Sequence, residues 1–252
     1  MIALTQCFSS EFAVRPFLTA EPERVIERLM TLTDHPSPHV RRWCSEGVRP
    51  RLPWGQRVHA LEKDPSPILP LLEALKDDPE EYVRRSVANT LNDIAKSKPA
   101  LVVSIAERWW KGGSKDRRRL VRHALRTLIK RGDPGALAVL GYGPPKALTA
   151  SLEVSPPTVS IGSSVELSLA LTNEASEPQP LLLDYQVHYV KADGSARPKV
   201  FKWKEITLRG DATLTKKHSM RKTTIRPLYV GEHRVDVLAN GEVVAEARFT
   251  LR

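Results

Sequence analysis

Two carboxylates, Glu46 and Asp93, stand among arginines and lysines in the first half of the chain. A carboxylate in such surroundings commonly serves as an ion-pair partner that orders its basic neighbours. It can also stabilise the positive charge that develops on a sugar as a base departs, and it can orient or deprotonate the attacking water. The spacing of the two residues leaves both interpretations open.

The basic residues around these carboxylates recur at helical spacing. Arg42, Glu46 and Arg49 lie at positions i, i+4 and i+7, on one side of a helix. Stacked helices of this kind would form a basic trough that suits a phosphate backbone, because each neutralised phosphate releases counterions. The residues predicted to bind a DNA backbone, which include the aligned positions of two further segments, are Arg41, Arg42, Arg49, Arg51, Arg84, Arg85, Asn89, Asn92, Lys96, Arg122, Arg126 and Lys130.

An aromatic residue adds to this chemistry. Trp54 ends the turn Arg49-Pro-Arg51-Leu-Pro-Trp54, and an indole face attracts cations, including an alkylated base. The sequence contains no phosphate-binding loop, dinucleotide fingerprint, HExxH or GxSxG motif. Its two cysteines, Cys7 and Cys44, do not complete a zinc site. We therefore expect no cofactor and no metal.

The first part of the chain, which must position these residues, shows helical periodicity and an internal repeat. The segment Asp34-His-Pro-Ser-Pro-His-Val40-Arg-Arg is echoed by Asp78-Pro-Glu-Glu-Tyr-Val83-Arg-Arg, and more weakly around Val121. The valines are 43 and then 38 residues apart. This spacing is typical of HEAT or armadillo helix pairs, which are stable only when stacked.

The second part has the periodicity of strands. Val165, Leu167, Leu169 and Leu171 alternate with polar or small residues, and so do Tyr185, Val187 and Tyr189, and Val243, Ala245, Ala247 and Phe249. Asp193-Gly194 and Asn240-Gly241 are hairpin turn sequences. About seven short strands in this region predict an immunoglobulin-like sandwich. We therefore expect a multidomain chain, α then β: a HEAT-like helical-repeat solenoid over residues 1–147 and an immunoglobulin-like β-sandwich over residues 148–252.

Composition supports a polyanionic partner for the first part. The chain has 252 residues and a formal net charge of +10, and residues 1–147 carry 25 basic against 17 acidic side chains. A basic surface that serves only solubility is the alternative. No stretch approaches the ~18 apolar residues of a membrane span, and the N-terminus lacks the pattern of a signal peptide, so we expect no membrane partner and a cytoplasmic location.

Several strings in the sequence resemble one family of DNA repair enzymes. They are Ser10-Glu-Phe-Ala-Val-Arg-Pro-Phe17, His35-Pro-Ser-Pro-His-Val-Arg-Arg42, Ser45-Glu-Gly-Val-Arg-Pro-Arg-Leu-Pro-Trp54, Val83-Arg-Arg-Ser-Val-Ala-Asn-Thr-Leu-Asn-Asp-Ile-Ala-Lys96 and His123-Ala-Leu-Arg-Thr-Leu-Ile-Lys130. They resemble the AlkC branch of the AlkC/AlkD superfamily, the HEAT-like DNA alkylation repair glycosylases. Some AlkC proteins carry an Ig-like domain after the repeats.

The resemblance implies a monofunctional DNA-3-methyladenine glycosylase, a hydrolase of base excision repair that acts on N-glycosyl bonds. Its implied substrates are cationic alkylated bases in double-stranded DNA, with 3-methyladenine first and 3-methylcytosine and 1-methyladenine as further candidates. Family members are thought to act without base flipping. By motif position, the implied catalytic residues are Asp93, Glu46 and Glu11, and Trp54 would contact the lesion. The resemblance also implies a monomer associated with the bacterial nucleoid.

The sequence leaves two alternative functions open. The resemblance implies further repeats before the Ser10 segment, whereas this chain begins nine residues ahead of it. A non-catalytic protein that binds alkylated or undamaged duplex, as a truncated relative of the glycosylase, is therefore an alternative. A scaffold for protein partners is another. In the second domain, Lys199, Lys202 and Lys204 would either brace the duplex or form a solvated strand face.

Overall fold

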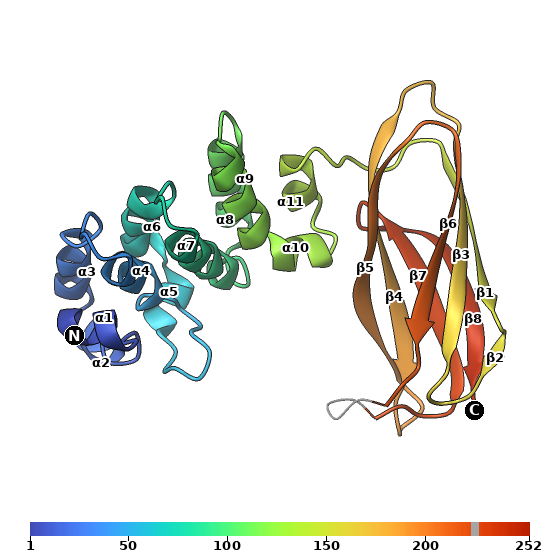
Figure 1. The fold of residues 1–252 in the computed structure, drawn as a ribbon, viewed down its shortest axis with the longest axis horizontal. Helices are drawn as coiled ribbons and strands as arrows, with labels where there is room; N and C mark the ends of the chain where they lie inside the picture. Colours follow the sequence, from blue (N-terminus) through green and yellow to red (C-terminus); the bar gives the residue numbers. More distant parts are fainter. Residues whose placement is uncertain (223–226) are drawn as a thin grey trace. The chain divides into compact units, whose positions relative to one another are not determined.

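The computed structural model describes residues 1–222 and 227–252, in which helices precede strands along the chain (Figure 1). Contacts between residues divide the chain into two compact units, Met1–Ile129 and Lys130–Arg252. No helix of the described residues is long and apolar enough to cross a membrane. The helical elements are α1 (Ile2–Cys7), α2 (Arg15–Ala20), α3 (Pro22–Met30), α4 (Pro38–Glu46), α5 (His59–Lys63), η1 (Ser66–Ile68), α6 (Leu69–Leu75), α7 (Glu81–Ile94), α8 (Pro99–Trp110), α9 (Lys115–Ala124), α10 (Arg126–Lys130) and α11 (Pro134–Val139).

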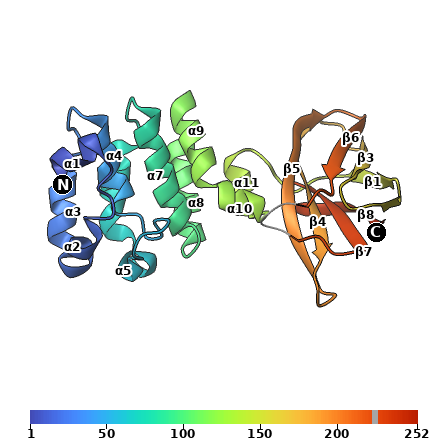
Figure 2. The same ribbon diagram turned by 60° about the horizontal axis from the view of Figure 1, so that its bottom comes forward.

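The central helix of the first unit is α7, which packs against both α4 and α9 (Figures 1 and 2). The repeated valines, Val40 on α4, Val83 on α7 and Val121 on α9, are all buried. Proline stands in the first turn of α4, where its missing N–H breaks no helical hydrogen bond. The predicted stack of helical repeats is confirmed by this shared apolar face.

One helix differs from its prediction. The spacing of Arg122, Arg126 and Lys130 predicts one continuous helix, but α9 ends at Ala124 and α10 begins at Arg126. The chain turns at Leu125, and Arg126 donates a hydrogen bond to the carbonyl oxygen of His123 at 2.7 Å. The third segment therefore does not present these three side chains from one helical face.

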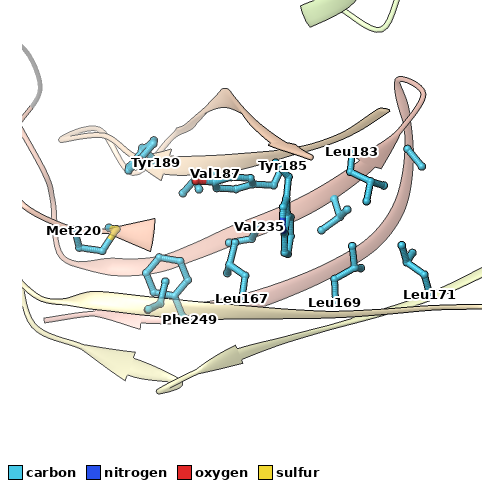
Figure 3. Close-up of a cluster of buried hydrophobic side chains, with 14 of the residues drawn as sticks. Leu167, Leu169, Leu171, Leu183, Tyr185, Val187, Tyr189, Met220, Val235 and Phe249 are labelled. Atoms are coloured by element: carbon cyan, nitrogen blue, oxygen red, sulfur yellow. The ribbon is translucent and has the colours of Figure 1, made fainter. Parts of the chain in front are cut away.

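The second unit contains two sheets that face each other across an apolar core (Figure 3). Among the described residues, the strand orders are β1-β3-β6 and β2-β8-β7-β4-β5, all antiparallel except β2 with β8. The strands are β1 (Leu148–Ser155), β2 (Thr158–Val159), β3 (Ser164–Asn173), β4 (Gln179–Val190), β5 (Ala196–Leu208), β6 (Asp211–Ser219), β7 (Gly231–Ala239) and β8 (Glu242–Leu251). The predicted β-sandwich is confirmed.

The alternation of apolar residues identifies the inner face of most strands. Leu167 and Leu169 of β3 face Leu183 and Tyr185 of β4 across the core (Figure 3). Val243 of β8 departs from the predicted alternation and is 55% exposed. The register between β7 and β8 shifts near this position, so that a bulge displaces the side-chain pattern by one residue.

The turn between β7 and β8 has the predicted hairpin geometry. Asn240 and Gly241 both have positive φ, 49° and 86°. The side chain of Asn240 accepts a hydrogen bond from Leu182 N at 2.7 Å. It also donates to the carbonyl oxygens of Gly143 and Pro180, at 2.7 and 3.1 Å. This one amide therefore joins the turn, the start of β4 and the segment before β1.

We expect Asn240→Ala to lower the free energy of unfolding of the second unit by about 2–4 kcal/mol, because it leaves buried backbone groups unpaired and strains a left-handed residue. Urea unfolding measures this change. Asp193→Ala is the matched control, since Asp193 bonds only locally to Ser195 in the exposed turn between β4 and β5. A loss under about 1 kcal/mol is expected there. Equal losses in both variants would contradict this account.

Candidate functional site

An alternating row of carboxylates and cations runs through the first unit. Glu11, in the segment between α1 and α2, is 3.3 Å from the guanidinium of Arg42 on α4. Arg42 is also 3.6 Å from Glu46, one helical turn further along. Arg49, just beyond the end of α4, contacts both Glu46 and Asp93 of α7. We call this set, together with Lys96, the charge row.

Arg49 is the bridge in the charge row. Its Nη1 donates to Glu46 Oε1 at 2.7 Å, and its Nε donates to Asp93 Oδ2 at 2.9 Å. Burial lowers the pKa of this guanidinium, but the hydrogen bond that it donates to Asp93 and the charge of Glu46 outweigh burial and raise the pKa above its ordinary value. Arg49 therefore remains charged and holds the two carboxylates on either side of a single cation.

Lys96 closes the row at its more accessible end. Its ammonium lies 3.1 Å from Asp93 Oδ1, so both oxygens of Asp93 have a cationic partner. The side chain of Lys96 is 32% exposed, whereas that of Asp93 is 1% exposed. A cationic group that approached Asp93 Oδ1 would therefore have to displace the lysine.

Two residues that the sequence did not single out support the row. The hydroxyl of Ser86 donates to Glu46 Oε2 at 2.7 Å. Arg15, fully buried, donates to the carbonyl oxygens of Gly47 and Arg49 at 3.1 and 3.0 Å. Burial, followed by the nearby Arg49, lowers the pKa of Arg15. In the sequence, Arg15 and Ser86 both lie in strings that carry the family resemblance, but neither residue type nor spacing pointed to these contacts.

Trp54 lies in the loop after α4 with its side chain wholly exposed. Its φ is 61°, a left-handed conformation that is unfavourable for a bulky residue. The loop is held on either side, by Val58 N donating to Pro50 O at 3.2 Å and by an ion pair of 2.9 Å between Arg51 and Glu62. A strained and solvated indole on an anchored loop is suited to contact a ligand.

Some of the residues predicted for the basic trough lie close together on α7 and α9 or just after α9. The guanidinium of Arg126 donates to Asn89 Oδ1 at 3.1 Å, and His123 Nε2 lies at the same distance from that oxygen. Burial, then the charges of Arg126 and Arg85, lower the pKa of His123. Arg85 is exposed and pairs with Glu81. A cleft of about 360 Å³ between α7 and α9 is lined by Glu81, Arg84, Arg85, Ala88, Asp116, Arg119, Leu120 and His123.

Two arginines predicted to bind a DNA backbone have internal roles instead. Arg41 forms a two-point contact with buried Asp78, at 2.6 and 3.0 Å, and donates to two carbonyl oxygens of the turn before α4. Arg84 is buried, donates to the carbonyl oxygens of Asp78 and Pro79, and pairs with Asp116. Because these contacts occupy their guanidinium groups, we no longer assign Arg41 and Arg84 to phosphate.

Other predicted positions are distributed as follows. The side chain of buried Asn92 accepts a hydrogen bond from Thr127 N at 3.3 Å. Arg122 is half-buried on α9, and exposed Lys130 belongs to the second unit. In the second unit, Lys202 pairs with Glu205, and Lys199 lies over the ring of Phe201.

Among residues 1–222 and 227–252, no group of three or more His, Cys, Asp or Glu side chains could hold a metal ion.

Comparison with known proteins identifies the class of this chain. A family model for the C-terminal Ig-like domain of the uncharacterised protein YhaZ matches residues 148–252, and a HEAT repeat model matches residues 68–97. Over 244 residues, the chain is 42% identical to the uncharacterized protein YhaZ of Bacillus subtilis (strain 168), covering 96% of this chain and 68% of that protein. The class is a HEAT-repeat protein with a C-terminal Ig-like domain.

Similarity to a solved structure identifies the family within this class. The chain superimposes with a TM-score of 0.93 on the Pseudomonas fluorescens alkylpurine DNA glycosylase AlkC bound to DNA containing an abasic site analog. The two are 39% identical, and the match covers 98% of this chain and 70% of AlkC. The chain belongs to the AlkC-type family of DNA alkylation repair glycosylases, as the sequence resemblance indicated.

We expect Arg49→Met to lower the free energy of unfolding of the first unit by about 3–5 kcal/mol, because Glu46 and Asp93 would face each other without their shared cation. Urea unfolding followed by helical circular dichroism measures this change. Arg85→Met is the control, since Arg85 pairs with Glu81 in solvent, and it should lose less than about 1 kcal/mol. Similar losses for the two variants would show that the bridge is not essential.

Proposed function

We propose that this protein is a monofunctional DNA glycosylase that removes cationic alkylated bases, chiefly 3-methyladenine, from double-stranded DNA. The main support is the position of Glu46 and Asp93 on either side of Arg49, in a chain whose fold matches that of AlkC. Methylated cytosine and 1-methyladenine are further candidate lesions. We place the two domains at residues 1–147 and 148–252, because β1 begins at Leu148, although contacts within the chain group residues 130–147 with the strands.

The proposed reaction needs little acid catalysis. A cationic alkylated base leaves as a neutral molecule when its N-glycosidic bond breaks, and the bonding electrons go to the base. The sugar then carries oxocarbenium character, which a fixed carboxylate stabilises. Water forms the new bond to the anomeric carbon and releases one proton. No covalent enzyme intermediate is required, and we propose that the base is not flipped into a pocket.

We assign the principal electrostatic and water-orienting role to Asp93, which approaches the sugar once Lys96 leaves Oδ1. Glu46 and Glu11 assist from the same row, and Trp54 contacts the lesion nucleotide. Arg42 and Arg49 hold the three carboxylates before the substrate arrives, so the proposed rearrangement is confined to Lys96. We propose that the protein acts as a monomer in the cytoplasm.

The DNA backbone would lie along the basic trough. Because Arg49 and Asn92 are buried and bonded inside the first unit, and Lys130 lies in the second unit, we no longer assign these three residues to phosphate. The residues that we retain for this role are Arg42, Arg51, Arg85, Asn89, Lys96, Arg122 and Arg126. Of these, Arg85 and Lys96 are exposed, and Arg126 is half-buried beside Asn89. Lys199, Lys202 and Lys204 of β5 are candidates for a second contact with the duplex.

A second candidate function is binding of duplex DNA without catalysis. The observation that favours it is the complete pairing of Asp93, whose two oxygens are occupied by Arg49 and Lys96. If Lys96 does not leave Asp93, the carboxylate serves only to order its basic neighbours. Base release from methylated DNA distinguishes the two functions, because a binder retains the duplex and releases no base.

We expect Asp93→Asn to slow release of 3-methyladenine by about 10²–10³-fold, because the neutral amide cannot stabilise the sugar cation. Methylated duplex with enzyme in excess, followed by chromatography of the free base, measures the rate. Glu107→Gln, which neutralises an exposed carboxylate on α8, is the control and should retain the wild-type rate. Full activity of folded Asp93→Asn would exclude the assigned role.

We expect Arg85→Gln and Arg126→Gln each to reduce the slope of log affinity against log salt concentration by about 1, if each guanidinium neutralises one phosphate. Fluorescence anisotropy of an undamaged duplex at several salt concentrations measures the slope. Arg41→Gln should leave it unchanged, because Arg41 is bonded to Asp78 inside the protein. If only Arg41→Gln reduced the slope, Arg41 would contact phosphate, and Arg85 and Arg126 would not.

A further inference from the structure

A chain of buried hydroxyl groups leads from α4 to the carboxylate of Glu46. Ser45 Oγ lies 2.6 Å from Ser86 Oγ, and Ser86 Oγ lies 2.7 Å from Glu46 Oε2. Ser86 is 2% exposed and Ser45 is fully buried. Thr90, one turn beyond Ser86 on α7, also reaches the carbonyl oxygen of Ser45 at 3.1 Å. These contacts fasten α4 to α7 immediately beside the charge row.

The direction of the hydrogen bonds follows from the chemistry of the groups. An ionised carboxylate only accepts hydrogen bonds, so Ser86 must give its single hydroxyl hydrogen to Glu46. The oxygen of Ser86 is then an acceptor for the hydroxyl of Ser45. Ser45 has one alternative acceptor, the carbonyl oxygen of Arg42 at 3.1 Å. The orientation of the Ser86 hydroxyl is therefore set by Ser45, which lies on α4 next to Glu46.

The two oxygens of Glu46 have partners of different kinds. Oε1 is bound by the guanidinium of Arg49 at 2.7 Å and is 3.6 Å from that of Arg42. Oε2 is bound by Ser86. The arginine contacts converge on Oε1 and leave Oε2 without a cationic partner. The serine bond at the second oxygen fixes the plane of the carboxylate.

We propose that Ser86, oriented by Ser45, is a positioning residue that fixes the plane of the Glu46 carboxylate for base release. This inference rests on the proposed glycosylase function and adds a residue to that site. Ser86 acts through Glu46 and does not touch the substrate. Its hydroxyl belongs to α7, the helix that carries Asp93, so a single helix sets the positions of both carboxylates.

The test is a double-mutant cycle of Ser86→Ala and Glu46→Met, with single-turnover release of 3-methyladenine as the measurement. Methionine fills the space of glutamate without accepting the hydrogen bond. We expect Ser86→Ala to slow release about tenfold in the wild-type background, with duplex affinity unchanged within about twofold. In the Glu46→Met background, Ser86→Ala should change the rate by less than about twofold, because its target is gone.

A helix that is merely loosened would give a different pattern. If Ser86 only packed α4 against α7, its loss would slow both backgrounds by the same factor, and additive losses therefore overturn the proposal. Ser45→Ala provides a second cycle that does not depend on the folding of the first variant, and about a twofold to threefold loss is expected, again only when Glu46 is present. No loss in either serine variant would also overturn the proposal.

A control variant and the wild-type rate distinguish failure of the glycosylase function from failure of the positioning role of Ser86. Thr33→Val removes a hydroxyl that is also buried and bonds only to the carbonyl oxygen of Met30 at 2.9 Å, away from the charge row. It should leave the rate unchanged. A wild-type chain that releases no base would overturn the glycosylase function and this proposal together. An active wild-type chain with additive serine effects would overturn the positioning role alone.

Discussion

The contact on which the site depends is the guanidinium of Arg49 between Glu46 and Asp93. Two buried carboxylates on neighbouring helices would repel one another, and the single cation between them converts that repulsion into two attractions. The same cation fixes the distance between the end of α4 and the last turns of α7. The geometry of the candidate site and the packing of α4 against α7 therefore depend on the same side chain.

The sequence was sufficient for the fold because the fold follows from local periodicity. The repeated valines on α4, α7 and α9 are buried, and alternate leucines of β3 face the sandwich core. The break after α9 was not predictable, because Leu125 is neither glycine nor proline and the residues around it keep helical spacing. The exposure of Val243 was not predictable either, because the amino-acid composition of β8 does not reveal the bulge between β7 and β8.

The site was predicted less completely than the fold. The repeat placed Glu46 and Asp93 in successive stacked segments, and the structure brings both to one arginine. Spacing did not distinguish Arg41 from Arg42, because the partner of Arg41, Asp78, is distant in the sequence. Spacing did not identify Ser86 either, because its partner, Glu46, is also distant in the sequence. A serine acquires a role only from the group that packing places opposite it, and residue type alone does not identify that group.

The exposure of Trp54 has an optical consequence. Trp43, Trp109 and Trp203 are buried, whereas the indole of Trp54 is wholly in water. A soluble quencher such as iodide will therefore reach Trp54 far more readily than those three indoles. When a duplex covers this side chain, part of the intrinsic fluorescence becomes shielded. Trp54 therefore serves as an intrinsic fluorescent probe at the loop where substrate contact is proposed. Binding of DNA to this loop can be followed without attaching a dye.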